Sequence, residues 1–174
     1  MARHVLVGVT GSIAAYKAAE LVRLFIAAGD DVHVVMTPAA CEFVSPLTFR
    51  TLSRNPVGVD QFAEPGQWRP GHIALAALAD IAIVSPATAN TIAKMACGIA
   101  DNLLTATLLA TRAKTVVAPA MNDGMWENTA TRANIATLRG RGVLVVGPDS
   151  GELACGTGGR GRMASPAEIF EAVR

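Results

Sequence analysis

The sequence of 174 residues has few aromatic side chains, few charged side chains and few cysteines. Aromatic residues make up 5% of the chain and charged residues 17%, whereas hydrophobic residues reach 51%. No apolar run approaches the roughly 20 residues that a membrane-spanning helix needs, and no signal-peptide pattern precedes the first apolar segment. These absences predict a cytoplasmic protein without membrane contact, folded as one domain over residues 1–174.

The three cysteines, Cys41, Cys97 and Cys155, are odd in number, widely spaced and without a Cys-x-x-Cys pattern. This arrangement argues against a disulfide framework and against a structural zinc site. Two histidines, His4 and His33, fall within strand-like segments and are interpreted as structural. We therefore expect free thiols and no metal site.

The charge pattern and the turn after the first strand argue against nucleic acid, dinucleotides and ATP as ligands. The net charge is +1, and no basic cluster with interleaved aromatic residues indicates nucleic-acid binding. The turn after the first strand, Gly11-Ser12, is neither a Gly-x-Gly-x-x-Gly nor a Walker A loop, which argues against a dinucleotide or ATP at that turn. The apolar content exceeds what a monomer of this size needs to fill its interior. We expect a small-molecule or peptide ligand and a homo-oligomer.

Apolar β-rich segments alternate with helical patterns along the chain. Residues 4–10 form a strand-like run, residues 13–28 show helical spacing, and residues 31–36 are again β-rich. Further β-rich segments occur at residues 81–85, 115–118 and 143–146. Residues 38–71 contain several prolines and predict short helices with an exposed connection. The alternation predicts an α/β fold with a doubly wound, mostly parallel sheet.

In such sheets, ligands bind beyond the carboxyl ends of the strands. Gly11 and Ser12 follow the first strand, where free amides at a helix N-terminus favour a phosphate, although Ser12 could simply cap the helix. Thr88 and Asn90 follow a later strand and could either cap a helix or bond the edge of a heterocycle. Asn122 follows the next strand and offers both a donor and an acceptor. A mononucleotide fits these loops best.

Two further features suggest chemistry. His72 stands at the start of a helical stretch, where it is either a surface group or a base kept neutral by the helix N-terminus. Residues 151–163 place Cys155 in a run too rich in glycine for a helix or an ordinary strand. This segment predicts either a flap that carries a thiol to a ligand or a solvated connection.

Several motifs occur in the order typical of one family: GVTGSIAAYK (residues 8–17), HI (72–73), PATANT (86–91), PAMN (119–122) and ACG (154–156). The chain thereby resembles the homo-oligomeric flavin-containing cysteine decarboxylases nearly end to end. The resemblance is nearest to the bacterial 4′-phosphopantothenoylcysteine decarboxylase domain of coenzyme A biosynthesis. It implies a flavodoxin/Rossmann-like three-layer fold and FMN bound between subunits of a trimer or dodecamer.

The resemblance also implies roles for individual residues. FMN would contact Gly11, Ser12, Thr37, Thr88, Ala89, Asn90, Thr91 and Met121. His72 would be the base, Asn122 would bind the substrate carboxylate, and Cys155 on the flap would be a proton donor. Further substrate contacts would come from Ala154, Gly156, Arg160 and Met163.

The implied reaction removes carbon dioxide from a terminal cysteine. Hydride transfer to the flavin oxidises the cysteine side chain to a thioaldehyde, which accepts the electrons of decarboxylation as an enethiolate. In the coenzyme A reaction the hydride then returns, and the expected partner is a fused or separate phosphopantothenoylcysteine synthetase. A peptidyl-cysteine decarboxylase, which stops at the enethiol, is the alternative. The chain departs from the family pattern at Ala74, Leu78 and residues 157–160, near the expected substrate site, so a peptide substrate stays an alternative.

Two other flavin-binding relatives fit the sequence less well. A non-catalytic regulatory subunit would carry a long acidic tail, which this chain lacks. A prenyl-flavin synthase would not be expected to carry the Ala-Cys-Gly element at residues 154–156. An FMN-dependent cysteine decarboxylase is the preferred interpretation.

Overall fold

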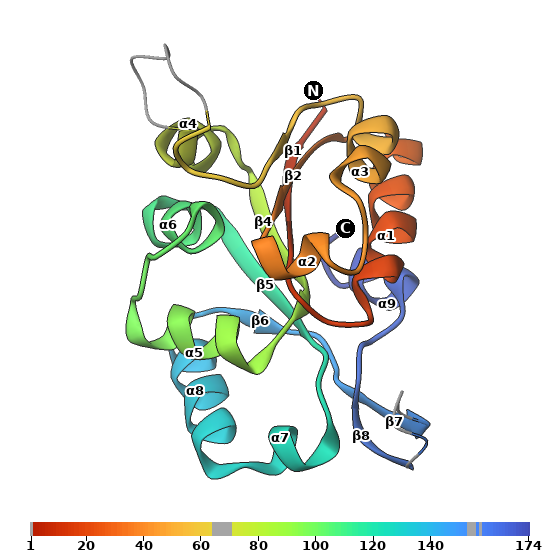
Figure 1. Ribbon diagram of the computed structural model, residues 1–174, viewed down its shortest axis with the longest axis vertical. Coiled ribbons are helices and arrows are strands. Elements are labelled where there is room, and N and C mark those ends of the chain that lie inside the picture. The colour runs from red at the N-terminus through yellow and green to blue at the C-terminus, as the bar shows by residue number, and fades with distance from the viewer. Residues whose placement is uncertain (1, 64–70, 153–155, 157) are drawn as a thin grey trace.

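The computed structural model describes residues 2–63, 71–152, 156 and 158–174. Its larger sheet has six parallel strands in the order β3-β2-β1-β4-β5-β6 (Figure 1). These strands are β1 (His4–Val9), β2 (Asp31–Met36), β3 (Val57–Gly58), β4 (Ile81–Ala87), β5 (Lys114–Pro119) and β6 (Leu144–Val145). The doubly wound parallel fold predicted from the sequence is confirmed, and chain order reverses between β1 and β4.

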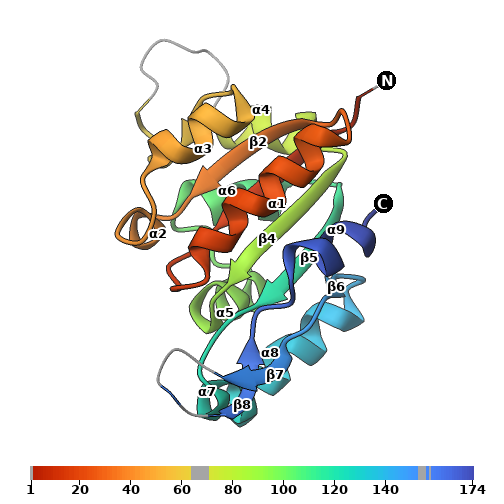
Figure 2. The same cartoon turned by 90° about the vertical axis from the view of Figure 1, so that its right-hand side faces the viewer.

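Helices cover both faces of this sheet. They are α1 (Ala15–Ala27), α2 (Pro38–Cys41), α3 (Pro46–Ser53), α4 (Gly71–Leu78), α5 (Ala89–Cys97), α6 (Leu103–Ala110), α7 (Asp123–Glu127), α8 (Thr129–Gly140) and α9 (Pro166–Glu171). Helices α1, α3 and α9 lie on one face, and α4, α5, α6 and α8 lie on the other (Figures 1 and 2). The result is a three-layer arrangement.

The alternation of side chains along β1 shows how the sheet joins the two layers. Val5 and Val7 belong to the core cluster that includes Phe25 of α1, whereas Leu6 packs in a separate cluster with Leu104 of α6. All five of these side chains are almost completely buried. Because both faces are covered, parallel strands of this kind read as continuous apolar runs in the sequence.

Local signals fix the ends of several elements. Gly29 follows α1 with φ of 87°, a left-handed conformation that glycine adopts without steric cost, as the sequence predicted for a helix stop. Thr37, Ser45 and Thr88 each accept a hydrogen bond from a backbone amide at the start of α2, α3 and α5. The short helices expected within residues 38–71 are present as α2 and α3.

The glycine-rich segment near the C-terminus differs from the prediction. Gly158–Arg162 forms β8, which pairs antiparallel with β7 (Asp149–Glu152) in a separate two-stranded sheet. Glycine has low strand propensity because it offers no side chain to pack. Here backbone pairing across the hairpin and close packing against the neighbouring loop override that propensity. The expectation that this run is too glycine-rich for a strand was wrong for these residues.

None of the described helices combines the length and the apolar character needed to cross a membrane.

Candidate functional site

A pocket of about 640 Å³ opens beyond the carboxyl ends of the central strands, within the range of about 300–1,000 Å³ usual for small-molecule sites. Three separate parts of the chain line it: the start of α1, the loop after β5, and the β7–β8 hairpin with the segment that follows. Its lining residues are Ser12, Ile13, Ala14, Tyr16, Lys17, Ala120, Met121, Asn122, Glu152, Gly161, Arg162 and Met163. We call this the carboxyl-edge pocket.

The N-terminus of α1 gives the carboxyl-edge pocket an anion-attracting wall. Helix α1 has no acidic residue in its first turn and no side-chain cap at Ala14, so its partial positive charge is not offset locally. Ser12 accepts a hydrogen bond of 3.3 Å from the Ala14 amide, and Lys17 adds a full positive charge to the lining. This donor set is suited to a phosphate.

Gly11 lies where the β1–α1 loop passes close to α2. A Cβ at this position would come within 2.6 Å of the Ala39 Cβ, a separation that packed carbon atoms do not adopt. Glycine is therefore required here by close backbone approach, and it keeps the loop that carries Ser12 against α2.

Thr10 ties two of the site-forming loops together. It is 1% exposed, and its Oγ1 donates to the Pro86 carbonyl at 2.7 Å and accepts from the Thr88 amide at 3.1 Å. The loops after β1 and β4 are thereby fixed relative to each other. The sequence analysis assigned Thr10 no role. A hydroxyl at the end of a buried strand could have indicated one, because a buried hydroxyl needs hydrogen-bond partners.

Asn122 lies at the mouth of the carboxyl-edge pocket as the N-cap of α7. Its Oδ1 accepts a hydrogen bond of 2.9 Å from the Gly124 amide, which orients the side-chain amide at the pocket. The preceding residue, Met121, donates its backbone amide to the Gly161 carbonyl of β8 at 3.0 Å. The loop after β5 and the hairpin thus form one continuous wall.

Met163 forms a buried part of the same wall. It is 2% exposed, and its sulfur accepts a hydrogen bond from Ser85 Oγ at 3.4 Å. The structure therefore brings together four residues predicted from the sequence: Ser12, Met121, Asn122 and Met163.

Arg160 is not among the described residues that line the carboxyl-edge pocket. Its guanidinium lies 5.9 Å from the centre of the Trp126 ring and donates to the Pro148 carbonyl at 3.4 Å. It faces a different hollow, between α7 and α8, and the hairpin arginine at the carboxyl-edge pocket is Arg162. The substrate contact expected of Arg160 stays a prediction.

Other predicted residues lie near the pocket without lining it. Thr37 caps α2, while Thr88 caps α5 through a hydrogen bond of 3.3 Å from the Thr91 amide. Ala89, Asn90 and Thr91 form the first turn of α5, with Thr91 buried. The capping interpretation weighed for Thr88 is correct, and the predicted flavin contacts of these residues remain predictions.

His72 is not among the described residues that line the carboxyl-edge pocket. It is the second residue of α4, which packs on α6 across the sheet from α1 (Figure 1). Ala154 and Cys155 lie outside the described residues, while Gly156 is exposed with φ of 79°. Tyr16, Lys17, Glu152 and Arg162 line the pocket although sequence reasoning gave them no firm role.

Comparisons with known proteins extend over almost the whole chain. Residues 1–174 match the Flavoprotein family. The bifunctional coenzyme A biosynthesis protein CoaBC of Haemophilus influenzae is 47% identical over 171 residues, and that of Bacillus subtilis is 48% identical over 169 residues. These matches cover 98% and 97% of this chain but 43% and 42% of the relatives. The chain thus spans less than half the length of these curated relatives.

Solved structures with the same fold include flavin-binding and cysteine-decarboxylating proteins. A PPC decarboxylase variant bound to pantothenoylaminoethenethiol superimposes with a TM-score of 0.88 and 32% identity, covering 100% of this chain and 97% of that one. The peptidyl-cysteine decarboxylase EpiD superimposes with a TM-score of 0.84 and 27% identity, covering 99% of both chains. With a family match from end to end and relatives of this similarity, the chain belongs to the Flavoprotein family.

Proposed function

We propose that the chain is an FMN-dependent decarboxylase that converts 4′-phosphopantothenoylcysteine to 4′-phosphopantetheine in coenzyme A biosynthesis. The observation that carries this proposal is the 47% identity to the CoaBC protein over 98% of this chain. The carboxyl-edge pocket supports it, because its size and position suit a mononucleotide at the switch point of a doubly wound sheet.

The residues present fit FMN. The start of α1, with Ser12 and Lys17, offers amides, a hydroxyl and a positive charge to the phosphate. Met121 and Met163 provide an apolar surface for a planar ring system. FMN supplies a hydride acceptor, which creates the electron sink that a cysteine carboxylate lacks. Gly11, Thr37, Thr88, Ala89, Asn90 and Thr91 complete the proposed cofactor site from the neighbouring loops.

Asn122 and Arg162 are the proposed recognition residues for the substrate at this pocket. The Asn122 side chain is oriented by its capping bond and can donate its amide to the substrate carboxylate. Arg162 offers a guanidinium to the phosphate of the substrate or to a carboxylate. Cys155, in the predicted flap of residues 151–163, is the proposed proton donor for the final step.

The site is proposed to form between copies of the chain. His72, the proposed base, lies in the helix layer on the other face of the sheet from α1, so a second copy would bring it to the pocket. Apolar side chains are available for such contacts: Leu47, Tyr16 and Leu109 are 66%, 61% and 61% exposed. A trimer or a dodecamer, with a fused or separate phosphopantothenoylcysteine synthetase as partner, is the proposed assembly.

A peptidyl-cysteine decarboxylase is the second candidate. The fold similarity to EpiD favours it, since the TM-score of 0.84 is close to that of the PPC decarboxylase variant. The first part of the reaction is the same for both substrates. The higher identity to the CoaBC relatives makes coenzyme A biosynthesis the preferred assignment.

Mass spectrometry separates the two candidates. The purified yellow protein is incubated with phosphopantothenoylcysteine and, separately, with a peptide that ends in cysteine. A loss of about 44 Da from the first substrate alone is expected, because carbon dioxide leaves and the hydride returns. A loss of about 46 Da from the peptide alone, which is carbon dioxide plus two hydrogens, would overturn the coenzyme A assignment in favour of peptide tailoring.

A further inference from the structure

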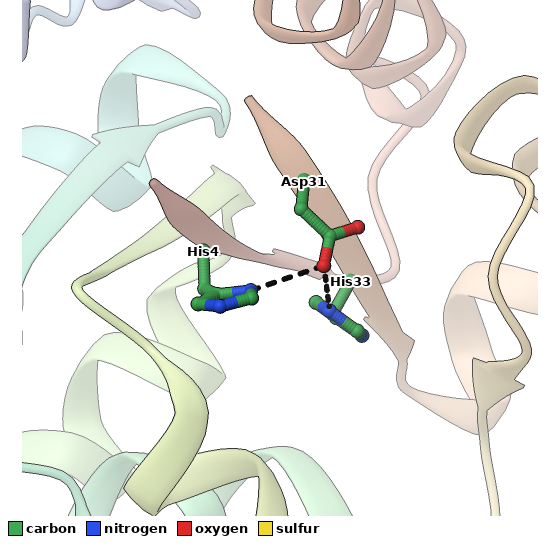
Figure 3. A group of neighbouring side chains, drawn as sticks. All are labelled: His4, Asp31 and His33. Carbon is green, nitrogen blue, oxygen red and sulfur yellow. Dashed lines mark hydrogen bonds and ion pairs between the residues drawn. The ribbon is translucent and has the colours of Figure 1, made fainter. Parts of the chain in front are cut away.

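Two histidines and an aspartate gather at the amino edge of the sheet, opposite the carboxyl-edge pocket. His4 is the first residue of β1 and Asp31 the first residue of β2, and these two residues are paired in the sheet register. His33 lies two residues further along β2, so its side chain is on the same face as that of Asp31. Figure 3 shows the three side chains pointing toward one another. We call them the amino-edge cluster.

Asp31 stands between the two imidazoles. Its Oδ2 lies 3.0 Å from His4 Nδ1 and 3.0 Å from His33 Nε2 (Figure 3). The facing nitrogen and oxygen atoms of the three residues all lie within 4.8 Å of one another. Metal–nitrogen bonds of about 2.0–2.1 Å place the ligands of one tetrahedral ion roughly 3.3 Å apart. The two contacts to Asp31 are already near this spacing, and the two imidazole nitrogens, which lie within 4.8 Å of each other, must move closer for all three atoms to bind one ion.

Asn55 holds the carboxylate in place. Its Nδ2 donates to Asp31 Oδ1 at 2.8 Å and to the Val32 carbonyl at 2.9 Å. The oxygen that faces the imidazoles is thus the one that Asn55 does not occupy. Hydrogen bonds of this kind to a ligating carboxylate are typical of metal sites and orient the ligand.

We propose that His4 Nδ1, His33 Nε2 and Asp31 Oδ2 bind one divalent transition-metal ion, such as Zn²⁺, that links the amino ends of β1 and β2. Two imidazoles and one carboxylate suit zinc and its neighbours rather than Mg²⁺ or Ca²⁺, which prefer oxygen ligands alone. Solvent can supply the remaining ligand, because the side chains of His4, Asp31 and His33 are 39%, 39% and 19% exposed. This inference does not depend on the proposed decarboxylase activity.

Proton positions must change when the ion binds. An ionised carboxylate only accepts hydrogen bonds, so with neutral rings the nitrogen of each imidazole that faces Asp31 carries the proton, whereas coordination needs the lone pair of that nitrogen. The proton of each ring therefore moves to the other ring nitrogen, His4 Nε2 and His33 Nδ1, and the carboxylate remains ionised. No oxidation or net proton release is required.

The test is Zn²⁺ titration of the untagged, FMN-containing protein by calorimetry, after treatment with a chelator. One ion per chain with micromolar or tighter affinity is expected, together with a saturable rise in the melting temperature. His4→Gln and His33→Gln should each weaken binding at least about tenfold, and Asn55→Ala about 10–100-fold. His72→Gln, which changes the remaining histidine of the chain, is the matched control and should bind Zn²⁺ normally.

Histidine footprinting with diethyl pyrocarbonate tests the site without any substitution. Zn²⁺ should protect His4 and His33 from modification and leave His72 unchanged. The proposal is overturned if Zn²⁺ protects neither residue, or if His4→Gln and His33→Gln folded by circular dichroism bind Zn²⁺ as tightly as the parent chain. Co²⁺ spectra that show thiolate ligation would also overturn it, since the site contains no sulfur.

Discussion

The backbone amide of Met121 donates a hydrogen bond of 3.0 Å to the carbonyl oxygen of Gly161, which joins the loop after β5 to strand β8. The two segments approach so closely that a Cβ on Gly161 would overlap the Met121 carbonyl oxygen. Gly161 therefore sets the position of the hairpin relative to Asn122, and with it the shape of the carboxyl-edge pocket.

Gly161→Ala should displace β8 from this loop. We expect decarboxylation to fall by at least about tenfold, because small displacements of site residues reduce rates strongly, and we expect weaker retention of FMN. Gly158→Ala is the matched control, since a Cβ there meets no atom within 4 Å. Activity assays and flavin absorbance after gel filtration check this, and equal behaviour of the two variants would contradict it.

Thr10→Val should destabilise the protein. The buried Pro86 carbonyl and Thr88 amide lose their shared hydroxyl partner, which costs about 1–3 kcal/mol of unfolding free energy. Urea unfolding measures the loss. Thr10→Ser keeps the hydroxyl and loses only the methyl group, which Thr10→Val retains, so Thr10→Ser should stay close to the parent chain. A stable Thr10→Val protein, or a larger loss in Thr10→Ser than in Thr10→Val, would contradict this role of the hydroxyl.

Asn122→Asp should weaken substrate binding without harming the fold. Aspartate caps a helix as well as asparagine does, but its charge repels a substrate carboxylate. We expect KM to rise about tenfold or more, equivalent to about 1.4 kcal/mol. Asn128→Asp is the control, because Asn128 caps α8 through the Ala130 amide at 2.9 Å and does not line the pocket. An unchanged KM for Asn122→Asp would remove this role.

Mixed oligomers should reveal a site shared between copies. As pure proteins that remain yellow, His72→Asn should be inactive, and Asn122→Asp should be less active by about tenfold or more at substrate concentrations well below KM. When the two variants are refolded or co-expressed together, some sites combine an intact His72 with an intact Asn122, and activity should partly return. Full activity of pure His72→Asn would exclude His72 as the base, and absence of rescue in verified mixed oligomers would place both residues in one chain.

Acid should weaken the C-terminal helix through Glu168. Hydrogen bonds from the Ser165 hydroxyl and amide to this carboxylate lower the pKa of Glu168 below its ordinary value of 4.5. Because the folded pKa is depressed, the stabilisation is complete above the unfolded pKa and is lost as pH falls through the folded pKa. Urea unfolding is measured from about pH 6 to about pH 3, where carboxylates titrate. The unfolding free energy of Glu168→Gln should fall less with decreasing pH than that of the parent chain. Identical slopes would contradict this.

Much of the fold could be predicted from the sequence, because buried parallel strands leave apolar runs that alternate with helical spacing. Strand β8 could not, since the pairing that stabilises Gly158–Arg162 lies in the backbone rather than in the side chains. The sequence also did not show which hairpin arginine lines the carboxyl-edge pocket: Arg162 does, and the substrate contact expected of Arg160 stays a prediction. Ser12 and Asn122 were found because chain order places them after strands, whereas Met121 was expected only from the family resemblance.

The amino-edge cluster was read as two structural histidines, because each falls in a strand pattern. His4 and His33 are 29 positions apart in sequence, and no spacing rule links them. They meet because β1 pairs with β2 in a register that places His4 beside Asp31, and this register forms only in the folded chain. Both histidines do lie in strands as predicted, and their shared neighbour Asp31 is what the sequence did not reveal.

The described walls of the carboxyl-edge pocket come from residues 12–17, residues 120–122, Glu152 and residues 161–163, so an early and a late part of the chain must meet before the pocket exists. A ribosome-bound chain that has emerged only as far as β5 already contains the start of α1 but lacks its facing wall. Loading of the proposed cofactor must therefore follow synthesis of the hairpin. Flavin fluorescence of nascent chains stalled at increasing lengths would show the chain length at which the protein first binds FMN.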